Sequence, residues 1–244
     1  MYPILFKIGN IAVYSWGVMS LIGFALGFTL AFILGRRHGI ETEDLFALLG
    51  ITIITGFAGA RGLYVMRNFS MFLSNPIEIF LPFYGGFDFY GAASEITVAV
   101  FLYSFIFNLS ALKIIDIGTP AVLFGYAIAK IGCFLNGCCY GKETNLPWGV
   151  TFPGLSGARH PTQIYDSLAA IFVLLILLNT LKIKKFDGQV GIYGSLLFSF
   201  YRFFGDFLRA DVSRYFGLSV IQILSLLVFL ASLLALMFFL KKNA

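Results

Sequence analysis

Long apolar runs recur along the whole chain, and short stretches rich in polar residues, glycine and proline separate them. A helix that crosses a bilayer needs about 20 mainly apolar residues. Seven runs satisfy that requirement, at residues 11–35, 44–66, 91–109, 118–136, 161–181, 188–208 and 217–240. The pattern therefore predicts an all-α fold, a polytopic transmembrane helical bundle of about seven spans.

The chain shows no internal repeat, low-complexity tract or polar segment long enough for a soluble domain. We therefore expect residues 1–244 to form a single integral membrane domain. Residues 1–10 lack the charged region and cleavage site of a removable signal peptide. The first apolar run is consequently expected to remain as a helix.

Lysine and arginine in the connections indicate the orientation of the bundle, because short cytoplasmic loops carry an excess of these residues. With alternating spans, one side of the membrane receives Arg36, Arg37, Lys113, Lys182, Lys184, Lys185, Lys241 and Lys242. The other side receives fewer, and it holds the longer connections near residues 67–90 and 137–160. This bias places the N-terminus outside, the C-terminus in the cytoplasm and the longer loops on the outer face.

The composition agrees with a membrane protein, since 59% of the residues are hydrophobic and only 12% are charged. Soluble domains carry about 25% charged residues. The net charge of +5 could indicate a nucleic-acid partner, but the basic residues are scattered rather than arranged in a stripe. They are better explained as topology signals and as contacts with anionic membrane lipids. No nucleic acid is therefore expected as a partner.

Ionisable residues inside the predicted spans are the first candidates for chemistry, because they are costly in a bilayer and usually functional. They are Arg61, Glu95, Lys130, Asp166, Arg202, Asp206 and Arg209. In the seven-helix map each of them lies toward the outer half of its helix. Snorkelling alone does not explain such a convergence, so the sequence predicts a polar site at the outer face.

The spacing of Arg202, Asp206 and Arg209 is informative. Arg202 and Asp206 are four residues apart, so they share one face of a helix and can pair, and Arg209 follows three residues later on the same stripe. A cationic face braced by a carboxylate suits a lipid phosphate. A structural ion-pair ladder between helices is the alternative explanation.

Glycine-rich and polar segments flank these charges and also have two explanations each. The turn at 84–91 could bind an anion through backbone N–H groups, or could simply begin a helix. His160 lies in a polar segment that could contact substrate or anchor the helix at the membrane surface. His38, in an inner loop, is expected to be a solvated residue.

The cysteines Cys133, Cys138 and Cys139 end the fourth predicted helix. Together with His160 they could suggest a zinc site, but their spacing is unlike the usual paired CxxC arrangement. A redox relay on the extracytoplasmic side is a second interpretation. Packing as small apolar side chains is the third, and the most common one for such cysteines.

Five blocks of the chain, taken in order, resemble the bacterial prolipoprotein diacylglyceryl transferase family. They read GARGLYV at 59–65, GGFDFYGA at 85–92, GCFLNGCCYG at 132–141, RHPTQIYD at 159–166, and the arginine–aspartate–arginine series of 202, 206 and 209. No block is decisive alone. Five blocks in this order, on a map of seven predicted helices, are specific for the family.

The resemblance implies an enzyme of lipoprotein biosynthesis, a multi-pass transferase of the bacterial cytoplasmic (inner) membrane. Such an enzyme moves a diacylglyceryl group from phosphatidylglycerol to the lipobox cysteine in the signal peptide of a prolipoprotein, and releases glycerol phosphate. The resemblance implies no metal and no organic cofactor. Two alternatives are a non-enzymatic lipid-binding or transport protein and a divergent member that transfers another lipid group. A thiol-dependent membrane oxidoreductase is a third.

The resemblance also assigns roles by position. Tyr90, Lys130 and Arg202 would be catalytic. Substrate binding would involve Arg61, Asn136, Gly141, His160, Gln163, Asp206 and Arg209. The chain departs from the family at four positions: Tyr90 replaces the histidine of an HGG turn, Lys130 replaces an arginine, Cys133 replaces an asparagine and Cys138 replaces a glutamate. We hypothesise that Tyr90 and Lys130 together replace the usual histidine and arginine, with the tyrosine as base or as hydrogen-bond donor.

Overall fold

Helices make up most of the chain in the computed structural model, which describes residues 1–9, 11–73, 75–80, 86–210 and 212–242. The side chains of residues 8, 11, 89, 90, 93 and 215 also lie outside the description. The chain divides into two compact units, one formed by Met1–Leu34 with Leu112–Ala244 and the other by Gly35–Ala111. Each unit is described by itself below.

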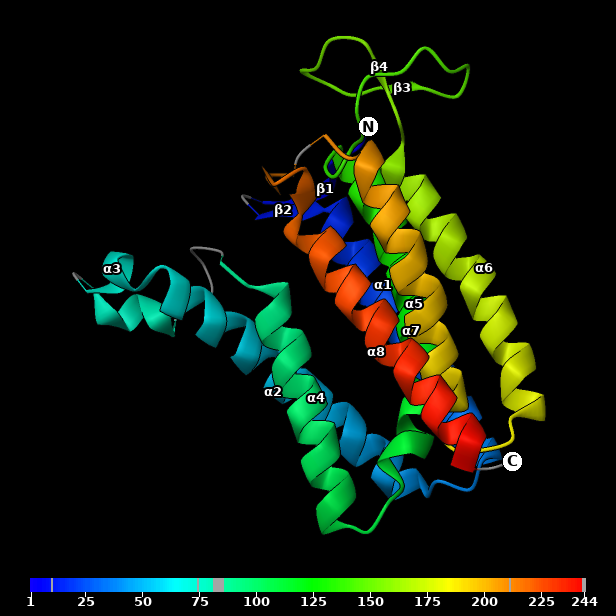
Figure 1. Ribbon diagram of the computed structural model, residues 1–244. Coiled ribbons are helices and arrows are strands. Elements are labelled where there is room, and N and C mark those ends of the chain that lie inside the picture. The colour runs from blue at the N-terminus through cyan, green and yellow to red at the C-terminus, as the bar shows by residue number, and fades with distance from the viewer. Residues whose placement is uncertain (10, 74, 81–85, 211, 243–244) are drawn as a thin grey trace. The chain divides into compact units, whose positions relative to one another are not determined.

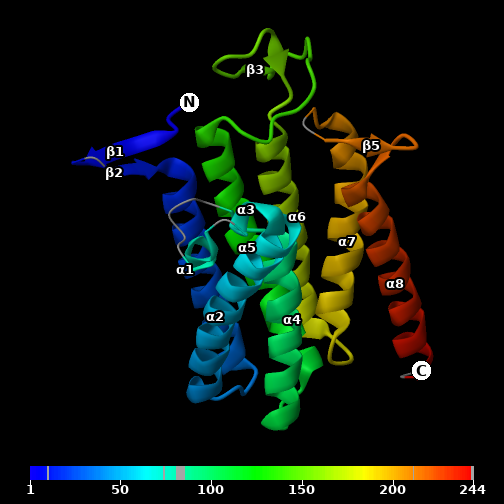
Figure 2. The ribbon, with the colours of Figure 1, turned by 90° about the vertical axis from the view of Figure 1, so that its left-hand side faces the viewer.

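The first unit is a helical bundle. Its helices are α1 (Ser15–Arg37), α5 (Ala111–Asn136), α6 (Thr162–Ile183), α7 (Gln189–Gly205) and α8 (Val220–Lys242), with the short 3-10 helix η3 (Asp206–Leu208) directly after α7. Both views show these helices running roughly side by side (Figures 1 and 2). Glycines allow α1 and α5 to approach closely, since a Cβ on Gly23 would collide with the carbonyl of Gly125. Small residues serve the same purpose in many membrane helix pairs.

The second unit contains α2 (Thr42–Arg67), α3 (Phe69–Phe72), the 3-10 helix η1 (Pro76–Ile79) and α4 (Phe89–Ile106). Helix α2 packs along α4. Gly59 and Gly91 meet at this contact, and neither position leaves room for a Cβ. The close approach explains why both positions hold glycine.

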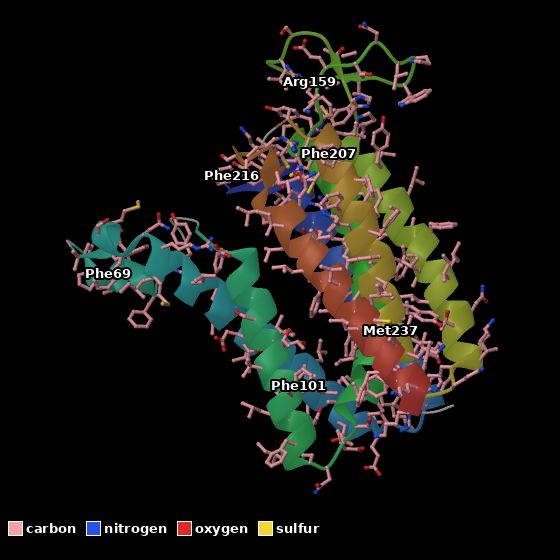
Figure 3. All side chains as sticks on the ribbon, in the orientation of Figure 1. Phe69, Phe101, Arg159, Phe207, Phe216 and Met237 are labelled. Atoms are coloured by element: carbon pink, nitrogen blue, oxygen red, sulfur yellow. The ribbon has the colours of Figure 1, made fainter. Side chains whose placement is uncertain are left out.

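Three short antiparallel hairpins belong to the first unit. They are β1 (Ile4–Ile8) with β2 (Ile11–Tyr14), β3 (Val150–Thr151) with β4 (Ala158–Arg159), and β5 (Arg214–Tyr215) with β6 (Leu218–Ser219). All three lie at the same end of the bundle, and α8 finishes at the opposite end (Figures 1 and 2). We call this end the hairpin end. Figure 3 labels Arg159 and Phe207 there, and Met237 toward the other end of α8.

The long helices occur where the apolar runs predicted them. Five of those in the described chain, α1, α2, α5, α6 and α8, are long and apolar enough to cross a membrane. The predicted start of the first helix was wrong. Helix α1 begins at Ser15 rather than at residue 11, because Ile11–Tyr14 pairs with Ile4–Ile8 as a strand. Helix α5 begins earlier than expected, at Ala111, and continues through Pro120.

A buried carboxylate joins α5 to the start of α7. Asp116 of α5 is fully buried and accepts hydrogen bonds from the backbone N–H groups of Gly188, Val190 and Gly191 at 2.8, 2.9 and 3.0 Å. The ammonium of Lys184 lies 2.8 Å from the same carboxylate. A negative charge at a helix N-terminus satisfies free donors and complements the helix dipole. This contact fixes α7 against α5, away from the hairpin end.

Candidate functional site

Asp166 is the centre of a charged cluster in the hairpin-end half of the bundle. It lies in the second turn of α6 and is 2% exposed. The Lys130 ammonium of α5 lies 2.7 Å from its Oδ2 atom, and the Arg202 guanidinium of α7 lies 3.2 Å from Oδ1. Arg209 places Nη1 3.8 Å from Oδ2. Three helices and the segment after α7 therefore meet on one carboxylate.

The cluster carries more positive than negative charge. Lys130, Arg202 and Arg209 are three cations, whereas Asp166 and Asp206 are two carboxylates. All five side chains are at most 12% exposed. Buried charges are strongly stabilised by opposite partners. An additional anion would complete the charge balance of this cluster.

A second carboxylate supports the arginines from behind. Asp206 is fully buried; its Oδ2 atom accepts a hydrogen bond of 2.5 Å from the Ser219 hydroxyl, and its Oδ1 atom lies 3.6 Å from Nη2 of Arg202. The backbone carbonyl of Asp206 accepts a hydrogen bond of 2.8 Å from Arg214. The predicted pairing of Arg202 with Asp206 is confirmed. Its Oδ2 atom is held by Ser219, whereas its buried Oδ1 atom has no hydrogen-bond partner among the described residues and faces Arg202 at ion-pair distance.

The tyrosines of the cluster were not among the predicted site residues. The Tyr201 hydroxyl donates a hydrogen bond of 2.9 Å to Oδ1 of Asp166. The Tyr126 ring lies beside the ammonium of Lys130, whose Nζ is 5.1 Å from the ring centre. Asp166 itself was noted as an intramembrane charge, but its position as the common partner of three cations could not be read from spacing along one helix.

The segment that carries Arg209 is tied to the long loop between α5 and α6. Gly141 pairs with Arg209 as an isolated β-bridge, and the backbone N–H of Lys142 donates to the carbonyl of Leu208 at 2.8 Å. Gly141 also donates to the carbonyl of His160 at 2.9 Å. A Cβ at Gly141 would lie 2.6 Å from the Cβ of His160 and 2.8 Å from the carbonyl oxygen of Leu208. Only glycine fits there, and the fit holds Arg209 in register with the loop.

His160 lies at the edge of this arrangement. Its Nδ1 atom is 3.3 Å from the Tyr165 hydroxyl, which also accepts a hydrogen bond of 2.8 Å from Nε1 of Trp148. The neighbouring Arg159 forms an ion pair of 2.9 Å with Glu143. These contacts link polar side chains of the loop between α5 and α6 to the start of α6. Within the described residues, His160 does not belong to the group formed by the three cysteines.

Side chains at the start of α6 donate hydrogen bonds to the turn that follows α5. The Thr162 hydroxyl donates to the carbonyl of Cys139 at 2.6 Å, and the fully buried Gln163 donates to the carbonyl of Cys138 at 2.5 Å. Asn136 is the last residue of α5. The Sγ atoms of Cys133, Cys138 and Cys139 all lie within 4.8 Å of one another.

The Cys139 thiol has an unusual electrostatic environment. Hydrogen bonding with the Cys133 and Cys138 thiols lowers its pKa below the ordinary value for cysteine, and desolvation opposes this effect. The positive charges of Lys130 and Arg209 lower the pKa further. The same two cations therefore act on Cys139 and on Asp166.

The two remaining predicted residues lie in the second unit. Arg61 is 8% exposed and donates hydrogen bonds to the backbone carbonyls of Glu78, Ile79 and Gly86 at 2.5, 2.9 and 3.1 Å. It fastens the connection between η1 and α4. Tyr90 is in the first turn of α4, where the structure describes the backbone only. Residues 84 and 85 of the predicted anion-binding turn lie outside the described residues.

Comparisons with known proteins show the family to which the chain is similar. A family model described as prolipoprotein diacylglyceryl transferase matches residues 3–238. A phosphatidylglycerol–prolipoprotein diacylglyceryl transferase of Finegoldia magna is 32% identical over 236 residues, covering 96% of this chain and 94% of that protein. The protein of the same name from Clostridioides difficile is 32% identical over 243 residues and covers 100% of this chain and 97% of its own length. One from Aliivibrio salmonicida is 33% identical, with 99% and 88% covered.

Proposed function

The chain belongs to the prolipoprotein diacylglyceryl transferase family, and on that premise we propose that it transfers the diacylglyceryl group of phosphatidylglycerol to the lipobox cysteine in a prolipoprotein signal peptide. The acceptor sulfur forms a bond to a glycerol carbon of the lipid. The bond from that carbon to the phosphate oxygen breaks, so that glycerol phosphate leaves. The acceptor thiol loses its proton, and the product is a thioether.

The observation that supports this proposal is the excess positive charge around Asp166. A departing phosphate develops negative charge, and preorganised cations stabilise such charge where water is excluded. The Arg202 guanidinium matches two phosphate oxygens with its planar fork, whereas Lys130 supplies a point charge. Family membership favours this catalytic role over simple lipid binding, because the matched relatives are named as transferases.

The other site residues follow from their contacts. We assign Lys130, Arg202 and Arg209 to the phosphate, with Asp166 and Asp206 as positioning residues. Asn136, Gly141, His160 and Gln163 shape the adjoining loop and the start of α6. Tyr90 keeps the role that its place in the family motif implies, as base or as hydrogen-bond donor.

The proposed topology puts the hairpin end on the outer face of the cytoplasmic (inner) membrane, with about seven spans in one integral domain. Lys241 and Lys242 end α8 at the opposite end of the first unit, as expected for a cytoplasmic C-terminus. A reporter fused after residue 244 should be cytoplasmic, and one inserted near Asn145 should be external. The reverse pattern would contradict this orientation and the outer location of the site.

The reaction itself is tested with purified protein, phosphatidylglycerol and a lipobox peptide, followed by mass spectrometry of the peptide. Phosphatidylethanolamine in place of phosphatidylglycerol tests the assigned donor. A peptide modified only in the presence of phosphatidylglycerol supports the proposal. An unmodified peptide with correctly inserted protein contradicts it.

A further inference from the structure

The three cysteines form a cluster that the proposed reaction leaves without a role. Cys133 lies in the last turn of α5, and Cys138 and Cys139 follow that helix. The Sγ atoms of Cys138 and Cys139 are 3.7 Å apart, and all three sulfurs lie within 4.8 Å of one another. Among the described residues, no histidine, aspartate or glutamate belongs to this group.

The turn after α5 is built to bring the thiols together. Gly137 has φ +76°, and Cys139 has φ +63°, a left-handed conformation that is uncommon for any residue except glycine. The backbone N–H of Cys138 donates to the carbonyl of Cys133 at 3.2 Å. Cys139 is thus held in a backbone conformation that local preference disfavours. Such conformations persist when surrounding contacts over-determine them, and they concentrate at functional sites.

Those surrounding contacts come from α6. Thr162 and the fully buried Gln163 donate to the carbonyls of Cys139 and Cys138. Both carbonyls are therefore held by the first turn of α6. A binding constellation needs this kind of support, since loose ligands lose affinity and geometry.

The spacing of one sulfur pair matches that of a metal–thiolate site, and the third sulfur lies within 4.8 Å of both. Zinc–sulfur bonds are about 2.3 Å long in tetrahedral sites, and two sulfurs bound to one such ion lie about 3.8 Å apart. The 3.7 Å between Cys138 and Cys139 agrees with that separation. Three thiolates and one divalent ion carry a net negative charge, and Lys130 precedes Cys133 by three residues on α5, so the two side chains share one helix face.

We propose that Cys133, Cys138 and Cys139 bind one thiophilic divalent metal ion, Zn²⁺, through their three sulfurs and leave its fourth position open next to the Asp166 cluster. Each thiol releases its proton to solvent when the ion binds. Soft thiolate ligands select zinc over magnesium or calcium. The site does not use His160, because among the described residues neither ring nitrogen of His160 belongs to the group of three sulfurs.

The acceptor thiol is the ligand expected at the open position. This part of the inference rests on the proposed transferase function. Catalytic zinc sites keep three protein ligands and admit water or substrate at the fourth position. A thiol that coordinates the ion loses its proton, which makes the sulfur nucleophilic without a separate base. The same ion would place the acceptor sulfur near the cations assigned to the phosphate.

Cobalt substitution tests metal binding without any activity measurement. The full chain, purified in detergent under reducing conditions with its affinity tag removed, is stripped with a chelator and titrated with Co²⁺. We expect one ion per chain and a sulfur-to-cobalt charge-transfer band, and Zn²⁺ should displace the cobalt. Cys138→Ser should weaken binding by more than about 100-fold, since even partners outside the ligand shell are worth about 10- to 100-fold. His38→Ala is the matched control and should bind as the parent does.

Two results would overturn the metal site. One is the absence of the charge-transfer band in the folded parent chain, which does not depend on any variant folding. The other is a disulfide among the three cysteines in freshly isolated protein, because an oxidised pair cannot ligate.

A lipobox peptide added to the cobalt form tests the open position. A change in the cobalt spectrum with the cysteine peptide, and none with a serine peptide, supports the acceptor role. An unchanged spectrum would overturn that role. Both readouts are independent of transfer, so a failure of the transferase proposal would be seen separately.

Discussion

The ammonium of Lys130 lies 2.7 Å from a carboxylate oxygen of Asp166, with both side chains at most 12% exposed. Two arginines share the same carboxylate. Asp166 therefore separates three cations that would otherwise repel one another across a poorly solvated space. In the proposed reaction, an anionic phosphate would add an acceptor to these cations beyond Asp166 and Asp206.

Asp166→Asn should abolish transfer and lower the free energy of unfolding by about 3 kcal/mol, because removing one partner leaves buried charge uncompensated. Unfolding of the detergent-purified protein by sodium dodecyl sulfate, followed by circular dichroism, measures the stability. Asp166→Glu keeps the charge and should be less destabilised. Equal stability of the asparagine variant and the parent would show that Asp166 does not hold the cations.

Arg202→Lys should lower kcat/KM for transfer by about 100-fold or more, comparable with the loss of one preorganised donor in other enzymes, because the ammonium cannot reproduce the guanidinium fork. Arg202→Ala should be inactive and still insert. The control is Arg67→Lys, since that side chain is 57% exposed, and it should retain parental activity. Parental kcat/KM in the Arg202→Lys variant would exclude bidentate phosphate binding by Arg202.

Tyr90→Phe removes one hydroxyl and preserves the ring. If the phenol donates to the departing phosphate, kcat should fall by about 100-fold, at the lower end of general acid contributions. The exposed Tyr14 offers a matched control, Tyr14→Phe. A parental rate for Tyr90→Phe across a pH series would reduce Tyr90 to a space-filling ring.

Asp116→Asn should destabilise the protein by about 3 kcal/mol, since it weakens a fully buried carboxylate that anchors α7. Asp187→Asn is the control, because that carboxylate is 45% exposed and shares Lys184; its change should stay within about 1 kcal/mol. Chemical unfolding at neutral pH measures both. Similar effects from both substitutions would contradict the anchoring role of Asp116.

The stabilisation that Lys184 contributes through Asp116 and Asp187 changes with pH in a defined direction. Desolvation acts to lower the pKa of Lys184, but its contacts with Asp116 and Asp187 outweigh that effect and raise the pKa above the ordinary value. The stabilisation is therefore fully present below the unfolded lysine pKa of about 10.5 and is lost as the pH rises through the folded value. The difference in stability between the parent and Asp116→Asn should stay constant from pH 7 to pH 9.

The sequence predicted the long helices well because apolar run length is set by the bilayer. It failed at the N-terminus, where Ile4–Ile8 and Ile11–Tyr14 form a hairpin. The turn signal was present, since a glycine–asparagine pair separates two runs rich in β-strand formers. A helix pattern was preferred because apolar residues continue from the second strand into α1.

The charged residues of the Asp166 cluster were each noted in the sequence, but the sequence did not show how they are arranged; their roles in the reaction stay predictions. Spacing on one helix correctly paired Arg202 with Asp206. It could not show that Lys130 and Asp166 meet, since they come from different helices, or that Cys133, Cys138 and Cys139 converge. That convergence depends on the left-handed backbone of Cys139 and on hydrogen bonds from α6, which no periodicity reveals.

Transfer to the acceptor thiol is the most direct test of the central claim. The full chain in phosphatidylglycerol nanodiscs is incubated with a lipobox peptide, and intact-mass and fragment spectra locate any addition. The account predicts a diacylglyceryl thioether on the peptide cysteine together with release of glycerol phosphate in equal amount. A serine peptide should stay unmodified. A folded, inserted chain that leaves the cysteine peptide unmodified, while still binding the lipid, would contradict the account.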